Sequence, residues 1–220
     1  MPPAAAMSNI WRLEEPLALG TEKDPNGIQH VEQAKDDSTL RTVDEVLRRR
    51  ARTHPDLPVV SYPSSGIEYV DYTFQQLDVF AYRAGKQLQA VMPSRASSQE
   101  KRIVVAMLGP SNLEYLVTMM GLFKLGHTVL FLSTRISVPA IESLITSTGA
   151  TYLLADPRYL EASLATKELV PGLQVLEMPT RTIFEFPIDV VGDTQLDAAL
   201  DASVETSQIV YIIHSSGTED

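Results

Sequence analysis

The residues best suited to chemistry stand at the carboxyl end of the sequence. An apolar run from Ile209 to Ile213 has the pattern of a buried strand, and it opens directly onto small and hydroxyl residues. A loop of that composition can arrange its backbone N–H groups in a concave nest, and its hydroxyls add further donors, so that it suits a phosphate group. We therefore predict a phosphate-binding, and hence cofactor-binding, loop made of His214, Ser215, Ser216, Gly217 and Thr218.

Other reactive residue types do not assemble into a site. His30, His54 and His127 are scattered without helical pairing or a carboxylate at ligand spacing, so we predict no metal site. The sequence has no cysteine nucleophile, and no residue is assigned a catalytic role. The segment Ser64-Ser65-Gly66 is explained more simply as a hairpin turn than as a second phosphate nest. Two interpretations of His214 are equally good: its side chain contacts the ligand, or it lies at the strand end and forms a hydrogen bond with a neighbouring residue.

Composition narrows the classes of partner. The 220 residues are 44% hydrophobic and 21% charged, which is typical of one or two small globular domains. A net charge of -10 repels nucleic acid and anionic membranes, so the run Arg48–Arg50 is assigned to a solvated helix face and the phosphate site must be local. The lack of cysteine fits a reducing compartment and no secretory signal is evident, so we expect a cytoplasmic protein.

The elements that would position the loop begin near residue 42. Residues 1–40 show no helical or strand period and are predicted to be a flexible leader. Thr42 and Glu45 form a capping box that opens a helix to His54. A hairpin follows over 59–72, and a second capping box, Thr73 with Gln76, opens a helix to Val91. The expected buried faces are Val43, Val46, Leu47 and Ala51 on the first helix, and Phe74, Leu77, Ala81, Ala84, Leu88 and Val91 on the second.

From Arg102 onward, strand and helix signals alternate. We predict strands over 103–108, 128–132, 152–155, 174–177 and 209–214, with helices over 111–125, over 139–148 and from Pro157. Ser111 is the expected cap of the first of these helices, and Gly126 and Gly149 end the first two. Gly126 also divides the apolar window 116–133, which is therefore a helix and a strand and not a membrane span. Residues 178–208 are expected to be irregular, with one short helix near 196–200.

This alternation indicates an α/β fold with a parallel sheet covered on both faces, preceded by a hairpin–helix unit. In such sheets, ligands bind at the carboxyl ends of the strands. The predicted loop from Ser215 to Thr218 follows one of these ends.

Three segments resemble the N-terminal part of the adenylate-forming superfamily, which includes acyl-CoA synthetases and adenylation domains of nonribosomal peptide synthetases. Residues 72–77, Tyr-Thr-Phe-Gln-Gln-Leu, are similar to its Tyr-Thr-Tyr-x-Glu-Leu element. Residues 121–133 are similar to its Ala-x-Leu-Lys-x-Gly helix end and the strand after it. Residues 213–218 resemble the start of its Thr-Ser-Gly-Thr-Thr-Gly-x-Pro-Lys phosphate loop.

Within the superfamily, the resemblance is closest to fungal synthetase-like carboxylic acid reductases. Their Leu-x-Ser-Pro-Arg-Asn-Ser stretch is approached at 132–137, where Thr134 and Ile136 depart from it. The resemblance covers residues 41–220 as a partial AMP-binding domain. It implies activation of a carboxylic acid by ATP, with Mg²⁺, to an acyl-adenylate for transfer to a carrier thiol, in fungal secondary metabolism.

The resemblance also implies an incomplete domain. Where the family continues Thr-Gly-x-Pro-Lys, this sequence has Glu219 and Asp220, and two carboxylates beside a triphosphate repel it unless Mg²⁺ intervenes. We therefore expect a truncated adenylation-domain protein that is catalytically incompetent alone and binds no cofactor tightly. Two alternatives stay open. The first is a non-catalytic interaction protein that binds a carrier, a partner synthetase or a homologous chain, with self-association through exposed apolar surface. The second is a split enzyme completed in trans.

Overall fold

The computed structural model describes residues 42–65, 67–188, 194–196 and 200–214. The chain divides into two compact units, Met1–Asp36 and Asp37–Asp220, and all described residues belong to the second. The leader predicted over residues 1–40 lies outside the described residues.

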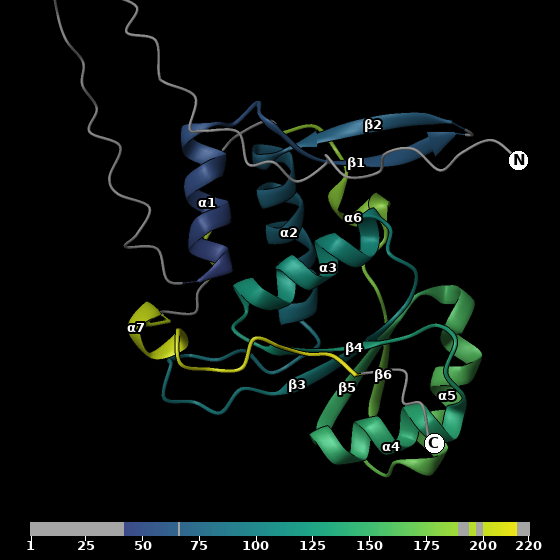
Figure 1. The fold of residues 1–220 in the computed structure, drawn as a ribbon. Helices are drawn as coiled ribbons and strands as arrows, with labels where there is room; N and C mark the ends of the chain where they lie inside the picture. The colour runs from purple at the N-terminus through teal and green to yellow at the C-terminus, as the bar shows by residue number, and fades with distance from the viewer. Residues whose placement is uncertain (1–41, 66, 189–193, 197–199, 215–220) are drawn as a thin grey trace, which may run out of the picture. The chain divides into compact units, whose positions relative to one another are not determined.

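The described part is an alternating α/β chain (Figure 1). Its helices are α1 (Val43–Thr53), α2 (Phe74–Gln89), α3 (Leu113–Lys124), α4 (Val138–Thr148), α5 (Leu160–Leu169), α6 (Arg181–Phe184) and α7 (Ala202–Glu205), with a 3-10 turn at Pro157–Tyr159. Its strands are β1 (Pro58–Ser65), β2 (Glu68–Thr73), β3 (Val104–Leu108), β4 (Thr128–Leu132), β5 (Ala150–Ala155), β6 (Gln174–Glu177) and β7 (Tyr211–Ile212).

Five strands form a parallel sheet in the order β6-β5-β3-β4-β7. Chain order and sheet order differ because β5 and β6 add to one side of β3, whereas β4 and β7 add to the other. All five carboxyl ends therefore meet at one edge of the sheet. The antiparallel hairpin of β1 and β2 forms a separate two-stranded sheet. The predicted α/β class, parallel sheet and preceding hairpin–helix unit are confirmed.

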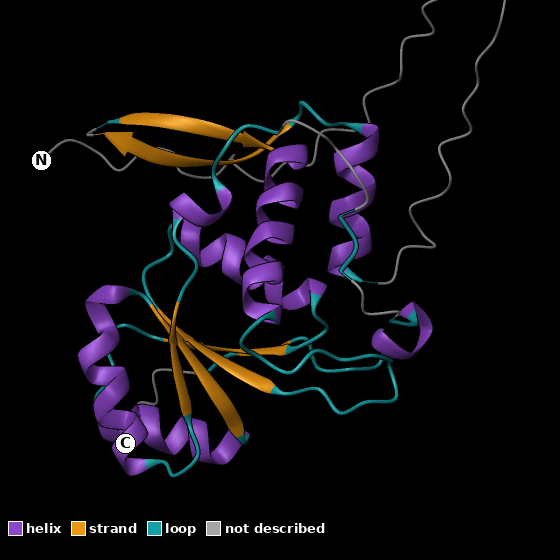
Figure 2. Ribbon diagram, turned by 180° about the vertical axis from the view of Figure 1, so that it is seen from behind, coloured by secondary structure: helices purple, strands orange, loops and turns teal. Residues whose placement is uncertain are grey.

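Helices cover both faces of this sheet, which Figure 2 shows from behind. Alternate strand residues point to opposite faces. Val105 and Met107 of β3 pack with residues of α2 and α3, whereas Ala106 and Leu108 pack with residues of α4. Because both faces are buried, the central strands are continuous apolar runs, as the sequence indicated.

Helix starts and stops follow their local chemistry. Both predicted capping boxes are present, at Thr42 with Glu45 and at Thr73 with Gln76. The apolar window 116–133 is divided between α3 and β4, as expected, and Gly126 between them has a φ of 71°. This left-handed conformation and the close approach of the Arg95 guanidinium, 2.5 Å from where a Cβ would stand, both require glycine at position 126.

Several predicted details are wrong. Val43 and Val46 of α1 are 43% and 42% exposed, because only the stripe through Leu47 joins the core shared with α2. Val91 lies beyond the end of α2 and is also exposed. The cap of α3 is Asn112, whose Oδ1 accepts the Tyr115 N–H at 2.9 Å, and not Ser111.

The segment after β6 also differs from its prediction. The short helices are α6 and α7, and the described ends of the range 196–200 lie in neither, while 197–199 are outside the described residues. The strand predicted over 209–214 contains only Tyr211 and Ile212, at the edge of the sheet. This segment is not buried, because Ile209 is 65% exposed, Tyr211 is 57% exposed and Ile213 is 69% exposed. Such an apolar run cannot be told from a buried strand by pattern alone, because both share the same residue types.

Candidate functional site: the carboxyl edge of the sheet

The carboxyl end of β7 is joined to that of β4 by the imidazole of His214. The Ser133 backbone N–H donates to His214 Nε2 at 3.2 Å. His214 is half-buried, and β7 pairs in parallel with β4 through Val129 with Tyr211 and Leu130 with Ile212. His214 therefore makes the strand-end contact that was one of its two interpretations. Ser215, Ser216, Gly217 and Thr218 follow it in the chain but lie outside the described residues.

The loop after β4 brings hydroxyls and a cation to the same edge. Ser133 Oγ accepts the Arg135 backbone N–H at 3.3 Å, which turns the chain directly after the strand. Thr134 and Arg135 are exposed. Because β4 and β7 are neighbours, these side chains stand beside the strand end from which the predicted phosphate loop leaves. A guanidinium at this position suits a phosphate oxygen.

At the carboxyl ends of β3 and β5, the polar groups are bonded to one another. The Asp156 backbone N–H donates to the Leu108 carbonyl at 2.9 Å, and the Asp156 carboxylate pairs with the Arg158 guanidinium at 2.8 Å. Hydrogen bonds from that guanidinium hold the pKa of the Asp156 carboxyl below its ordinary value. Gly109 packs against Asp156 so closely that an added Cβ would lie 3.1 Å from the aspartate Cβ. Asp156 is thus a structural cap, as the sequence indicated for the Asp-Pro-Arg helix start.

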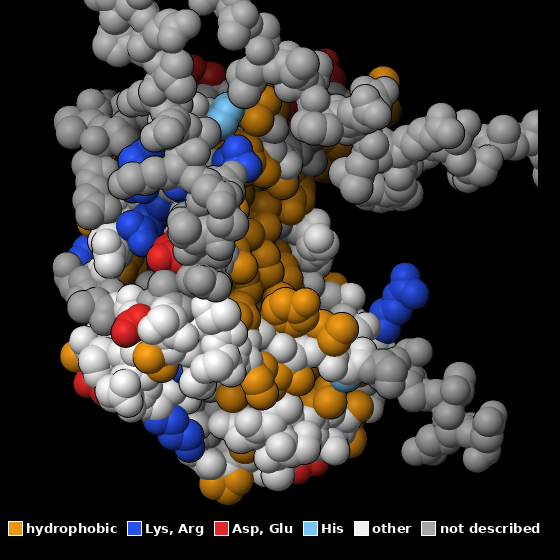
Figure 3. Space-filling model, turned by 60° about the vertical axis from the view of Figure 1, so that its left-hand side comes forward, with side chains coloured by type: hydrophobic (Ala, Val, Ile, Leu, Met, Phe, Trp, Pro, Cys, Tyr) orange, Lys and Arg blue, Asp and Glu red, His pale blue; other side chains and the backbone are white. Residues whose placement is uncertain are grey.

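Beside the edge, an aromatic row runs from α3 to β7. The rings of Tyr115 and Phe131 lie 6.1 Å apart, and those of Phe131 and Tyr211 lie 5.9 Å apart. Burial raises the pKa of Tyr115 to about 12. The far end of the row is open, because Tyr211 is largely exposed. Hydrophobic side chains also gather in a stripe on one face of the molecule (Figure 3).

A buried lysine secures the helices above the sheet, and sequence reasoning missed its role. The Lys124 Nζ atom donates to Asp44 Oδ1 and Asp78 Oδ1, both at 2.6 Å, and to the Thr194 carbonyl at 3.4 Å. Its side chain has no exposed surface. The cluster joins α1, α2 and α3 to residue 194. The signals in the sequence were a charge on the mostly apolar helix α3 and its place in a family-like stretch, and neither identifies partners 46 and 80 positions away.

The described residues contain neither a metal-binding group of three or more His, Asp or Glu side chains nor a helix long and apolar enough to cross a membrane.

Of the predicted site, the structure brings His214 to the carboxyl edge. It adds Ser133 and Arg135, which sequence reasoning placed only within a family-like stretch. Only the parallel pairing of β4 with β7 places Ser133 and Arg135 beside His214. This pairing cannot be predicted before the order of the strands in the sheet is known.

This parallel α/β sheet, preceded by a hairpin–helix unit, has the fold of the N-terminal subdomain of adenylate-forming enzymes. The chain belongs to the family of AMP-binding enzymes, which it matches over residues 47–219. Enzymes of this family use ATP, the source of the adenylate.

Similar proteins include two fungal reductases and one solved structure. The chain is 32% identical to an adenylate-forming reductase of Aspergillus terreus over 52% of its length, and 28% identical to a carboxylic acid reductase of Neurospora crassa over 54%. The matched segments span 11% of each reductase. The inhibitor-bound N-terminal domain of FACL13 from Mycobacterium tuberculosis has the same fold, with a TM-score of 0.58 and 19% identity over 81% of this chain and 42% of that one.

Proposed function

We propose that this chain forms the phosphate-loop side of an adenylation domain, in which residues 214–218 hold the phosphates of ATP. The reaction is activation of a carboxylic acid. One carboxylate oxygen attacks the α-phosphorus, the bond between the α-phosphate and the departing pyrophosphate breaks, and an acyl-adenylate remains for transfer to a carrier thiol. The observation that carries the proposal is the hydrogen bond between His214 and Ser133, which fixes the strand from which the loop leaves.

The chemistry of the edge agrees with this role. Phosphoryl transfer needs donors on the departing phosphates and stabilisation of charge at the reacting phosphorus. Backbone N–H groups, the hydroxyls of residues 215, 216 and 218, and the Arg135 guanidinium would supply the donors. Mg²⁺ would offset the carboxylates of Glu219 and Asp220. The similarity to fungal reductases favours a role in fungal secondary metabolism, in the cytoplasm.

We further propose that these 220 residues do not complete the reaction alone and bind ATP weakly. Supporting this, the functional groups that the described residues bring to the carboxyl edge are donors suited to phosphate, at Ser133 and Arg135. The matched segments also cover a small part of each reductase.

The test is nuclear magnetic resonance of the ¹⁵N-labelled protein, which detects weak binding residue by residue. Millimolar MgATP and pyrophosphate should both shift the amide signals of residues 214–218 and of Ser133, whereas adenosine, which has no phosphate, should not. Shifts confined to other residues would contradict the phosphate-loop assignment. ATP–pyrophosphate exchange with a panel of carboxylic acids should stay at background, and exchange above background would overturn the proposed incompetence.

A second candidate function is partner binding without catalysis, which the exposed side chains of Ile209, Tyr211 and Ile213 favour. Its partner would be an adenylation domain or a carrier of a related synthetase. Stable co-sedimentation with such a domain, lost in Tyr211→Ser and accompanied by an unresponsive phosphate loop, would favour this function over the first.

A further inference from the structure

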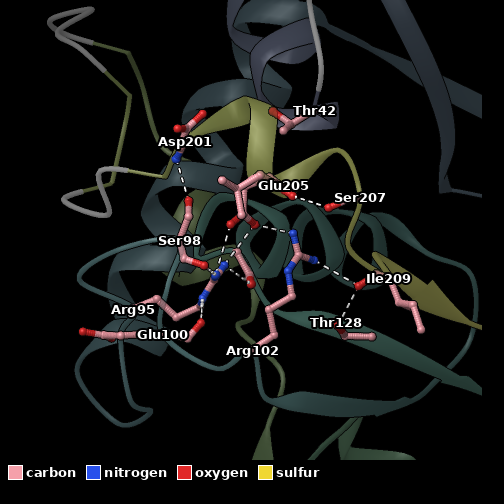
Figure 4. A network of polar contacts seen from close by, with 12 residues as sticks. Thr42, Arg95, Ser98, Glu100, Arg102, Thr128, Asp201, Glu205, Ser207 and Ile209 are labelled. Atoms are coloured by element: carbon pink, nitrogen blue, oxygen red, sulfur yellow. Dashed lines mark hydrogen bonds and ion pairs between the residues drawn. The ribbon is translucent and has the colours of Figure 1, made fainter.

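Buried charges at the amino edge of the sheet hold the segment that enters β7. Arg95 and Arg102 converge on the Glu205 carboxylate (Figure 4). Arg95 pairs with it in two parallel bonds, from Nη1 to Oε2 and from Nη2 to Oε1, each 3.0 Å. The Arg95 and Glu205 side chains are 3% and 2% exposed. Such bidentate, buried pairs are geometrically specific and are costly to break, because the remaining charge stays buried.

The Arg95 guanidinium is fixed by hydrogen bonds on all sides. Its remaining N–H groups donate to the carbonyls of Ser98, Glu100 and Gly126, so that all five guanidinium donors are used. Burial alone would raise the pKa of Glu205, but hydrogen bonds from Arg95, Ser98 and Arg102 outweigh it and hold that pKa below its ordinary value. Glu205 is therefore a fixed anion near neutral pH.

The cluster reaches β7 through one carbonyl group. Arg102, which also pairs with Glu205, donates from Nη1 to the Ile209 carbonyl at 3.0 Å. The Thr128 hydroxyl donates to the same carbonyl at 2.7 Å. Thr128 is the first residue of β4, so this carbonyl is fixed beside the start of the neighbouring strand.

This anchoring matters because β7 is a short edge strand: besides it, few contacts define the register, chiefly the bond between His214 and Ser133 and the packing of Ile212 on the core. Its ladder with β4 consists of two residue pairs. Ile209, Tyr211 and Ile213 on one face are exposed, and Val210 and Ile212 on the other face are only partly buried. Register is strongly specified where one face of a strand is buried and weakly where it is not. A slip of one residue would displace the strand end by about 3.3 Å and reverse its faces, which would misplace the loop that follows His214.

We infer that Glu205 is a positioning residue for the predicted phosphate loop: through Arg102 and the Ile209 carbonyl it sets the register of β7, and thereby the place of His214, after which residues 215–218 follow in the chain. The effect on phosphate binding rests on the proposed function. The anchoring of β7 by Glu205 does not depend on it. Glu205 acts from the amino edge of the sheet, through contacts to Arg102 and the residue before β7.

The test compares Glu205→Gln with Asp78→Asn, which disrupts the equally buried Lys124 cluster but not the entry to β7. The reporter is the Val129 N–H, which donates to the Val210 carbonyl at 3.0 Å across β4 and β7. The reference is the Asp156 N–H, bonded to Leu108 between β5 and β3. In Glu205→Gln, amide hydrogen exchange of Val129 should accelerate at least tenfold relative to Asp156, and pyrophosphate should bind residues 214–218 at least tenfold more weakly. In Asp78→Asn, both amides should change together, with loop binding retained.

A milder variant keeps the inference testable if Glu205→Gln does not fold. Thr128→Val keeps the side-chain shape and removes only the hydroxyl bond to Ile209, so it should show the same selective effect at a few-fold size. Equal acceleration of Val129 and Asp156 in these variants would overturn the inference, and so would a loosened β7 with unchanged pyrophosphate binding. If the unmodified loop does not respond to ATP or pyrophosphate, the proposed function falls together with the loop-positioning role, and the exchange of Val129 still decides whether Glu205 anchors β7.

Discussion

At the scale of single residues, folding changes the chemistry of His127. The imidazole is 1% exposed, and its Nε2 lies 3.1 Å from the Pro93 carbonyl. Burial lowers its pKa from 6.5 to about 4, aided by the nearby cations Arg95 and Arg102. The ring is therefore neutral in the folded protein near neutral pH, and Nε2 carries the proton that it donates to Pro93.

This shift predicts a pH dependence of stability. Between pH 6.5 and 4 the unfolded chain takes up a proton at His127 that the folded chain refuses, so the free energy of unfolding falls as pH falls through this window. A shift of this size corresponds to roughly 3 kcal/mol once pH is below 4. The measurement is urea unfolding at pH 4.5 to 7.5 of the wild type and of His127→Gln, which can still donate to Pro93. We expect a shallower pH slope in the variant, and parallel slopes would contradict the burial argument.

Residue types with local effects were predictable from the sequence, and those with distant partners were not. Thr42, Thr73 and Gly126 act within a few positions of themselves, so their capping and turn roles could be predicted. Lys124 and Glu205 find their partners 46 to 110 positions away. No pattern along the chain connects such residues before the strand order is known.

At the scale of elements, the backbones of α2 and α3 approach each other where Gly85 faces Gly121. A Cβ at Gly121 would lie 3.0 Å from the Gly85 backbone nitrogen and 3.1 Å from the Ala81 carbonyl oxygen. A Cβ at Gly85 would meet chiefly the terminal methyl Cδ1 of Leu196, at 2.7 Å. The obstacles at Gly121 are helix backbone, whereas the nearest one at Gly85 is the end of a flexible side chain and the Gly121 carbonyl oxygen lies farther off, at 3.3 Å.

These contacts predict different costs for the same substitution. Gly121→Ala should lower the free energy of unfolding by about 1–2 kcal/mol more than Gly85→Ala, because the added methyl meets helix backbone at shorter distances in the first case and the helices must separate further. The gain in helix propensity from glycine to alanine is similar at both positions and cancels in the comparison. Thermal or urea unfolding of the two variants measures the difference. Equal stabilities would show that α2 and α3 can move apart without cost.

The elements themselves were largely predictable, with one informative exception. Strands β3 to β6 and helices α1 to α5 are close to their predicted ranges, because apolar period and capping residues are local signals. The segment from Ile209 to Ile213 was predicted to be buried and is an exposed edge. Burial of a strand depends on what lies beside it, which its own residues do not specify. Whether the predicted leader and residues 215–218 behave as expected stays a prediction, since they lie outside the described residues.

At the scale of the whole molecule, the exposed side of β7 predicts self-association. Its outward residues are apolar, and the edge of a sheet offers unpaired backbone groups to a second chain. We expect light scattering to show oligomers of the wild type and a shift toward monomer in Tyr211→Ser.

The control is Ile67→Ser on the hairpin, where the side chain is 94% exposed but lies far along the chain from β7. It also removes a largely exposed apolar side chain and should leave association unchanged. A monodisperse wild-type monomer with a single cooperative melting transition would contradict self-association through this edge.

The strand order also dictates when each part can assemble during synthesis on the ribosome. Thr128 and Ile209, which meet at the start of β4 and β7, are 81 positions apart, whereas the partners on the other side, β5 and β6, emerge earlier. The nascent chain can therefore complete four strands while β4 still presents an open edge. We expect chaperones that bind nascent chains to engage this edge until residue 209 has left the exit tunnel, so that β7 joins the sheet only after the other four strands have paired.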